Sequence, residues 1–217
     1  MSQYKALEEK IKACRKCDLR STCTQVVPGE GNEKAAIMFI GEGPGEKEDK
    51  LGRPFVGAAG KFLDEMIGLI GMKREDVFIA NVVKCRPPGN RDPMPEEAEA
   101  CWPWLLAQIK IINPKLIVTL GRHAMERILP NQKISQMHGK ALRREITGLG
   151  KQVFYALYHP AAALYQGSLR ETIKTDFKKI PKILKVIDKG DGEENKKKEI
   201  QMNADRFSDE NKQESLF

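Results

Sequence analysis

The sequence predicts an α/β protein in three layers, in which helices cover both faces of a central sheet of four parallel strands. Two observations support this prediction. Four short apolar runs, each typical of a buried strand, alternate along the chain with segments of helical periodicity. Glycine, asparagine or histidine lies at or near the end of each run, as expected where the carboxyl ends of parallel strands form a ligand site. The 217 residues suffice for a sizeable apolar core.

The elements are expected in an order that lets each strand lie parallel to the others. Residues 3–13 have helical spacing, and the segment after Pro95 begins with an acidic turn that continues as a helix past Pro103. The strands are expected at residues 35–40, 77–83, 116–120 and 153–158, and the other helices at 57–71 and 170–187.

A change in composition marks the end of the predicted domain. Residues 1–187 are expected to form one domain, and residues 188–217, which contain few apolar side chains, a disordered acidic tail. The tail holds nine acidic and six basic residues, so the other 187 residues carry a net charge of +10. A basic body suits nucleic acid, because each cation that meets a phosphate releases a condensed counterion. Solubility alone is the simpler explanation.

Four of the five cysteines form two pairs, Cys14-x2-Cys17 and Cys85-x15-Cys101. No apolar run reaches the roughly 20 residues of a membrane span, and the first residues do not resemble a signal peptide. A cytoplasmic protein is therefore expected, in which paired cysteines more often bind metal than form disulfides. Zinc is one alternative by spacing alone, although zinc sites more often use two close pairs. Cys23 is expected to be a small, partly buried residue.

The residues just after the strands have side chains suited to chemistry. Gly41-Glu42-Gly43-Pro44-Gly45 lets a planar ligand approach the backbone, and the Glu42 carboxylate is placed to stabilise positive charge or polarise water. Asn81 offers both a donor and an acceptor to a base edge. His159 is placed to donate to a developing oxyanion. A tight turn, a polar strand end and a structural histidine are the simpler alternatives.

Five motifs, in this order, resemble those of the family 4 uracil-DNA glycosylases, which are the iron–sulfur class. The resemblance extends from about residue 5 to residue 187 and rests on Cys14-x2-Cys17, Gly41–Gly45, Gly52-Arg-Pro-Phe-Val-Gly57, Asn81-Val-Val-Lys-Cys-Arg-Pro-Pro88 and His159-Pro-Ala-Ala162. It implies the fold of these enzymes. It also implies their activity, the hydrolysis of uracil from DNA to leave an abasic site in base excision repair.

The resemblance further implies roles for individual residues. It implies a [4Fe–4S] cluster on Cys14, Cys17, Cys85 and Cys101. For a flipped uracil it implies Gly41 and Gly43 at the backbone, Phe55 as the stacking face, Asn81 and His159 as hydrogen-bonding partners, and Glu48 near the C5 edge. The better-known uracil glycosylases carry aspartate where this chain has Gly43, so the resemblance does not identify the residue that activates water.

The expected partner is uracil-containing DNA. Lys84, Arg86 and Arg91 in the loop after the second strand are expected to contact phosphates. Leu164 is expected either to wedge into the space that a base leaves or to pack in the core. Nothing in the sequence demands more than a monomer. The remaining alternative is a non-catalytic, metal-stabilised nucleic-acid-binding module, which would not need the strand-end set Glu42, Asn81 and His159.

The last residues suggest a second partner. Gln213, Leu216 and Phe217 resemble the opening of a sliding-clamp-binding peptide, although the usual aromatic pair is incomplete. Chance similarity is the alternative.

Overall fold

The computed structural model describes residues 1–190 of the chain. It has two units, Met1–Ile180 and Pro181–Phe217. The first unit contains the sheet and the candidate site, and the described part of the second, residues 181–190, is helical. Most of the predicted tail and the whole of the clamp-like peptide lie outside the described residues, so both remain predictions. Within residues 1–190, no helix combines the length and the apolar character that crossing a bilayer requires.

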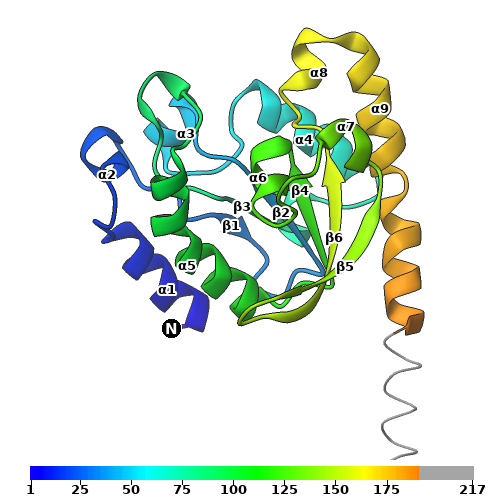
Figure 1. Cartoon of the computed structure of the whole chain (residues 1–217), viewed down its shortest axis with the longest axis horizontal. Helices are drawn as coiled ribbons and strands as arrows, with labels where there is room; N and C mark the ends of the chain where they lie inside the picture. Colours follow the sequence, from blue (N-terminus) through cyan, green and yellow to red (C-terminus); the bar gives the residue numbers. More distant parts are fainter. Residues whose placement is uncertain (191–217) are drawn as a thin grey trace, which may run out of the picture. The chain divides into compact units, whose positions relative to one another are not determined.

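Six strands form one mixed sheet in the order β1-β3-β2-β4-β6-β5 (Figure 1). The four inner strands are parallel and confirm the four predicted runs: β3 (Phe78–Asn81), β2 (Ile37–Gly41), β4 (Leu116–Leu120) and β6 (Gly150–Leu157). The sequence did not indicate the antiparallel edge strands β1 (Glu30–Gly31) and β5 (Ala141–Ile146). The first has only two residues, and half of the second is charged.

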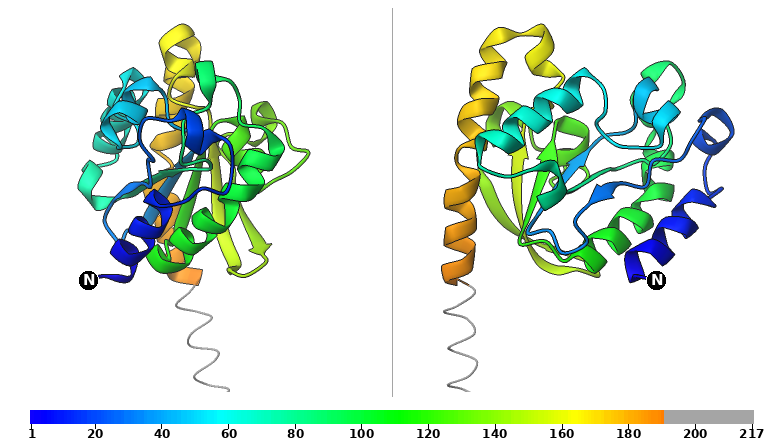
Figure 2. Two further views of the ribbon diagram at one scale, coloured as in Figure 1. Left: turned by 90° about the vertical axis from the view of Figure 1, so that its left-hand side faces the viewer. Right: turned by 180° about the vertical axis from the view of Figure 1, so that it is seen from behind.

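Helices cover both faces of the sheet. In Figures 1 and 2, α1 and α5 lie together on one face, and α4 and α9 lie on the other. The helices are α1 (Gln3–Lys12), α2 (Leu19–Thr22), α3 (Glu46–Leu51), α4 (Ala58–Leu69), α5 (Pro95–Ile112), α6 (Arg122–Glu126), α7 (Ile134–Met137), α8 (Ala162–Tyr165) and α9 (Gly167–Phe177), with short 3-10 turns η1 (Arg74–Asp76) and η2 (Pro88–Asn90).

The structure confirms the helix that was expected to continue past Pro103, because α5 runs from Pro95 to Ile112 with Pro103 inside it. The last predicted helix begins earlier than expected, at Gly167, and a turn at residues 178–179 separates α9 from the helical residues that follow.

Strand β2 shows how the core is divided between the two faces. All five of its residues are buried. Met38 and Ile40 belong to the cluster that includes the apolar residues of α1 and α5. Phe39 points the other way and stacks on Phe177 of α9, with ring centroids 5.7 Å apart. Burial on both faces explains why the parallel strands are continuous apolar runs.

Candidate active site

A cleft of about 440 Å³ opens at the carboxyl edge of the parallel strands. Three strand ends meet there, because Gly41 of β2 lies beside Asn81 of β3 in the sheet and His159 follows β6. Loop residues between α3 and α4 complete the wall. The cleft brings together most of the residues expected from the sequence to contact a base, namely Glu42, Gly43, Glu48, Phe55, Asn81 and His159.

The glycines after β2 leave room for neighbouring side chains. A Cβ on Gly41 would lie 2.5 Å from Oδ1 of Asn81 and 2.6 Å from the Phe55 ring. A Cβ on Gly43 would lie 2.7 Å from Cγ2 of Val83. Separations this short are essentially never seen for real Cβ atoms. Glycine at both positions is therefore required by packing within the protein, in addition to any approach of a ligand.

Phe55 is held in a strained backbone conformation. Its φ of 51° lies in the left-handed region, which non-glycine residues rarely adopt. Arg74 donates hydrogen bonds to the carbonyls of Pro54 and Phe55, the second at 3.2 Å. A Cβ on Gly60 would lie 1.8 Å from the Phe55 carbonyl oxygen, so only glycine fits there. The ring stacks at 5.6 Å from the ring of His159, which fixes one wall of the cleft.

Asn81 is buried, with one polar atom left without a partner. Its exposed fraction is 1%, and its Oδ1 has no hydrogen-bond partner among the described residues. An unmet buried acceptor costs about 1–3 kcal/mol, so such an atom at the wall of a cleft is suited to meet a donor of the ligand. The orphaned Oδ1 is the clearest sign that the cleft is shaped for a polar ligand.

The structure contradicts the phosphate contact predicted for Lys84. Its exposed fraction is only 2%. Its Nζ donates to the Asn81 carbonyl at 2.7 Å and to Oε1 of Gln108 at 2.5 Å. Burial lowers the pKa of this ammonium to about 8. Lys84 thus anchors the end of β3 to helix α5, a role that its position in a basic loop did not indicate.

His159 presents a proton donor to the cleft. The Ala161 backbone N–H donates to Nδ1 of His159 at 3.1 Å, so Nδ1 is the acceptor and the proton of the neutral ring is on Nε2. Burial lowers the pKa of His159 to about 4, so the ring is neutral at pH 7. A neutral ring can stabilise an oxyanion without prior protonation.

The two carboxylates of the cleft have different surroundings. Oε1 of Glu48 accepts from the backbone N–H groups of Val56 and Gly57, each at 2.8 Å, and so holds the segment just before α4. Glu42 has no such backbone donors among the described residues. Its Oε2 lies 3.7 Å from Nε2 of His123. Burial raises the pKa of Glu42, partly offset by His123.

The four paired cysteines surround one small internal cavity, although they come from three parts of the chain. None forms a disulfide. Burial raises the pKa of Cys17, Cys85 and Cys101. The indole N–H of Trp104 donates to Sγ of Cys14 at 3.1 Å. Four converging thiols with an outer hydrogen-bond donor fit a thiolate-bound metal group.

Cys23 is also buried and is a hydrogen-bonding neighbour of Cys85. It does not line the cavity that the other four share.

The other residues expected to contact DNA lie near the mouth of the cleft. Arg91 lines it and pairs with Glu97 through contacts of 2.6 and 2.8 Å. Arg86 donates to Asn90 at 2.7 Å. Leu164 is 44% exposed, which excludes the core-packing alternative. Its neighbour Tyr165, which the sequence pattern did not single out, is 90% exposed and lines the cleft.

Comparison with known proteins identifies the family. Residues 28–185 match the model of the uracil DNA glycosylase superfamily. A type-4 uracil-DNA glycosylase of Archaeoglobus fulgidus is 52% identical over 186 residues, which cover 83% of this chain and 92% of the relative. A type-4 uracil-DNA glycosylase of Sulfurisphaera tokodaii is 49% identical over 83% of this chain and 84% of the relative. One of Thermotoga maritima is 46% identical over 82% of this chain and 93% of the relative. The chain therefore belongs to the uracil-DNA glycosylase superfamily and, within it, to the type-4 uracil-DNA glycosylases.

Proposed function

We propose that the cleft at the carboxyl edge of the sheet receives a uracil extruded from DNA and hydrolyses its N-glycosidic bond. The product is an abasic site, the starting point of base excision repair. Family membership makes the protein a uracil-DNA glycosylase. The observation that carries the residue assignment is the orphaned Oδ1 of Asn81, which lines the same cleft as Phe55 and His159.

Recognition follows from the hydrogen-bonding pattern of the base. Oδ1 of Asn81 accepts from N3–H of uracil, and its NH₂ group donates to O4. Cytosine presents an acceptor at N3 and an amino group at C4, so both contacts would be repulsive. Phe55 supplies the stacking face, worth about 1–3 kcal/mol. Glu48, fixed by two backbone donors, is proposed to face the C5 edge of the base, where its bulk would exclude the methyl group of thymine.

The reaction needs stabilisation of two opposite charges. The bond between C1′ and N1 breaks with its electron pair passing to N1, which leaves positive charge on the sugar and an anionic uracil. Nε2–H of His159 donates to O2 of the leaving group, and ionised Glu42 stabilises the sugar cation. Water then bonds to C1′ and gives its proton to Glu42, while the uracil anion takes a proton from solvent. The sum is the addition of one water molecule.

For the cysteine site we propose a [4Fe–4S] cluster held by Cys14, Cys17, Cys85 and Cys101. The converging thiols and the Trp104 donor support it, and iron–sulfur clusters are commonly held by four cysteines. When bound, the cluster supplies a rigid crosslink that fixes the loop after β3 against α1 and α5. The cysteines would position this loop and take no part in bond cleavage.

Contacts with DNA complete the proposal. Arg86 and Arg91 are proposed to meet phosphates, and Leu164 to fill the space left by the base. Extrusion costs a few kcal/mol, less for uracil opposite guanine than for a stable pair. A monomeric, cytoplasmic enzyme is the simplest form, and binding of a sliding clamp through Gln213, Leu216 and Phe217 remains a prediction.

An end-labelled oligonucleotide with one uracil tests the function. Incubation with the protein followed by hot alkali should cleave the strand at the uracil, and a matched strand with thymine should stay intact. Glu42→Gln should abolish cleavage while retaining binding to the uracil strand. Intact strands at every salt concentration and temperature would favour the non-catalytic binding module instead. Iron and sulfide content and brown colour in protein purified without air distinguish the cluster from zinc.

A further inference from the structure

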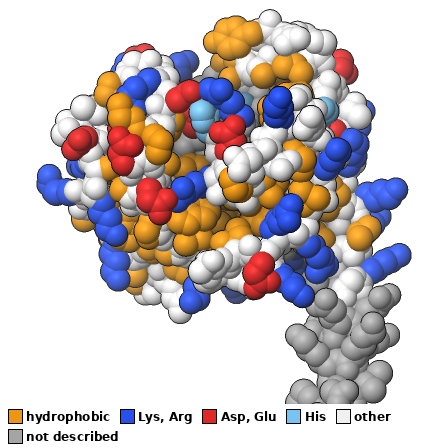
Figure 3. All heavy atoms as spheres, viewed as in Figure 1, with side chains coloured by type: hydrophobic (Ala, Val, Ile, Leu, Met, Phe, Trp, Pro, Cys, Tyr) orange, Lys and Arg blue, Asp and Glu red, His pale blue; other side chains and the backbone are white. Residues whose placement is uncertain are grey.

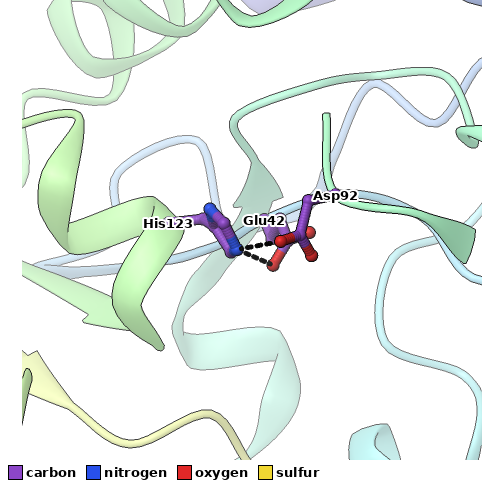
Figure 4. A group of neighbouring side chains, drawn as sticks. All are labelled: Glu42, Asp92 and His123. Carbon is purple, nitrogen blue, oxygen red and sulfur yellow. Dashed lines mark ion pairs between the residues drawn. The ribbon is translucent and has the colours of Figure 1, made fainter. Parts of the chain in front are cut away.

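Three polar side chains from separate parts of the chain, Glu42, Asp92 and His123, point toward one another (Figure 4). One nitrogen or oxygen atom of each lies within 4.8 Å of those of the other two. Asp92 is 3.1 Å and Glu42 3.7 Å from the same nitrogen of His123. On the face viewed in Figure 3, histidine, acidic and basic side chains are grouped together. The reaction as proposed above uses only Glu42 from this group.

A guanidinium completes the cluster. Nη2 of Arg122 is 2.6 Å from Oδ2 of Asp92, and Nε of Arg122 lies 3.0 Å from Nε2 of His123. A divalent cation would need the same two atoms of Asp92 and His123 and would be repelled by the guanidinium. The arrangement therefore fits a hydrogen-bonded charge network better than a metal site.

His123 and the base cleft lie on different hollows that share Glu42. Glu42 lines both the base cleft and a second hollow of about 450 Å³. His123 lines the second hollow and not the base cleft. His123 thus has no direct route to the uracil ring and reaches the reaction only through Glu42.

We propose that His123 and Asp92 are positioning residues that orient the Glu42 carboxylate and set the pH at which it is ionised. This inference rests on the role proposed above for Glu42. Since Glu42 must be charged both to stabilise the sugar cation and to accept a proton from water, its ionisation limits excision at low pH. The second hollow offers water an approach to Glu42 that is separate from the base cleft.

The two neighbours act on Glu42 in opposite directions. The ionisable groups that face Glu42 are His123 and Arg122, from the start of α6, and Asp92, from the segment after η2. His123 and Arg122 lower the pKa of Glu42, and Asp92 raises it. Of the other charged residues around the hollow, Arg127 is paired with Glu99. Removing His123 and removing Asp92 should therefore shift in opposite directions the pH below which the excision rate falls, here called the acid limb of the pH–rate profile.

Single-turnover excision, measured against pH on a uracil oligonucleotide, tests the proposal. In His123→Asn the acid limb should move to higher pH, and in Asp92→Asn to lower pH, each by about half a unit or more. Affinity for DNA at neutral pH should stay within about twofold of the unmodified protein in His123→Asn, because His123 acts on Glu42 and not on DNA. The matched control is Glu65→Gln, which removes a surface carboxylate paired with Arg170 at 2.7 Å and should leave the profile unchanged.

The outcomes separate this inference from the proposed function. If Glu42→Gln excises uracil at the unmodified rate, the role of Glu42 is wrong. If Glu42→Gln is inactive but His123→Asn and Asp92→Asn keep the original acid limb, or shift it in the same direction, the positioning role is wrong. Thermal melting identifies a variant that fails to fold. In that case the measurement is repeated with His123→Gln or Asp92→Ser.

Discussion

At the scale of single residues, the site depends on where side chains are missing as much as on where they are present. Gly41 has an ordinary φ, so backbone freedom does not explain glycine there. The explanation is contact: Asn81 and Phe55 occupy the space that a Cβ would fill. The sequence suggested that this turn lets a ligand approach, but the close approach of two site residues depends on tertiary packing that no local pattern reveals.

Gly41→Ala should reduce uracil excision on the order of a hundredfold, because Asn81 and Phe55 must move by several tenths of an ångström. Gly68→Ala is the matched control. Gly68 is exposed on α4, and no atom lies within 4 Å of the place that a Cβ would occupy, so the change should leave activity intact and stabilise the helix by about 1 kcal/mol. Comparable loss of excision in both variants would contradict the packing explanation.

Asn81→Ala should lower excision on the order of a hundredfold while changing affinity for undamaged DNA by less than about twofold. The substitution removes the contacts with the base edge and leaves the phosphate contacts in place. Single-turnover rates and a fluorescence-anisotropy titration measure the two effects. Equal losses in both measurements would mean that Asn81 supports the DNA-binding surface instead of reading the base.

At the scale of elements, a network of ion pairs holds the loop between α3 and α4. Arg74 of η1 is paired with Glu30 of β1 and Asp64 of α4, at 2.7 and 2.8 Å, and bonds the Phe55 carbonyl. Elements far apart in sequence thus fix one strained residue of the site. Because these partners are distant in sequence, Arg74 could not have been identified as a site residue before the fold was known.

Arg74→Ala should reduce excision by about tenfold or more, because Phe55 would relax from its left-handed backbone conformation. Arg53→Ala is the control. Arg53 also pairs with Glu30, at 2.7 Å, but among the described residues it is Arg74 whose guanidinium donates to the Phe55 carbonyl. Excision by Arg53→Ala should stay near that of the unmodified protein. A similar defect in both variants would assign the effect to Glu30 and not to Phe55.

The cysteine site can be tested at the same scale. Cys85→Ala should lose iron and colour and lower the melting temperature, because the loop after β3 loses its attachment to α1 and α5. Cys23→Ala changes a buried neighbour of Cys85 that is not among the proposed ligands, and it should keep both iron and colour. Full iron content in Cys85→Ala would show that the ligand assignment is wrong.

At the scale of the whole molecule, the parallel core and the edge that carries the site were predictable from sequence. Four apolar runs marked the buried strands, and the polar residues at or near their carboxyl ends indicated Glu42, Asn81 and His159. The edge strands were not predictable, because β5 lies exposed and carries charged residues. Lys84 was misassigned for a related reason: its charge suggested a surface, whereas the fold buries it between Asn81 and Gln108.

The arrangement of the whole cleft can be tested most directly by a crystal structure of Glu42→Gln bound to DNA that contains one uracil. The expected result is an extruded uracil stacked on Phe55, with N3–H and O4 facing the Asn81 amide and O2 facing Nε2 of His159. A uracil bound in the second hollow, or still stacked within the duplex, would contradict the assignment of this cleft as the site of base excision.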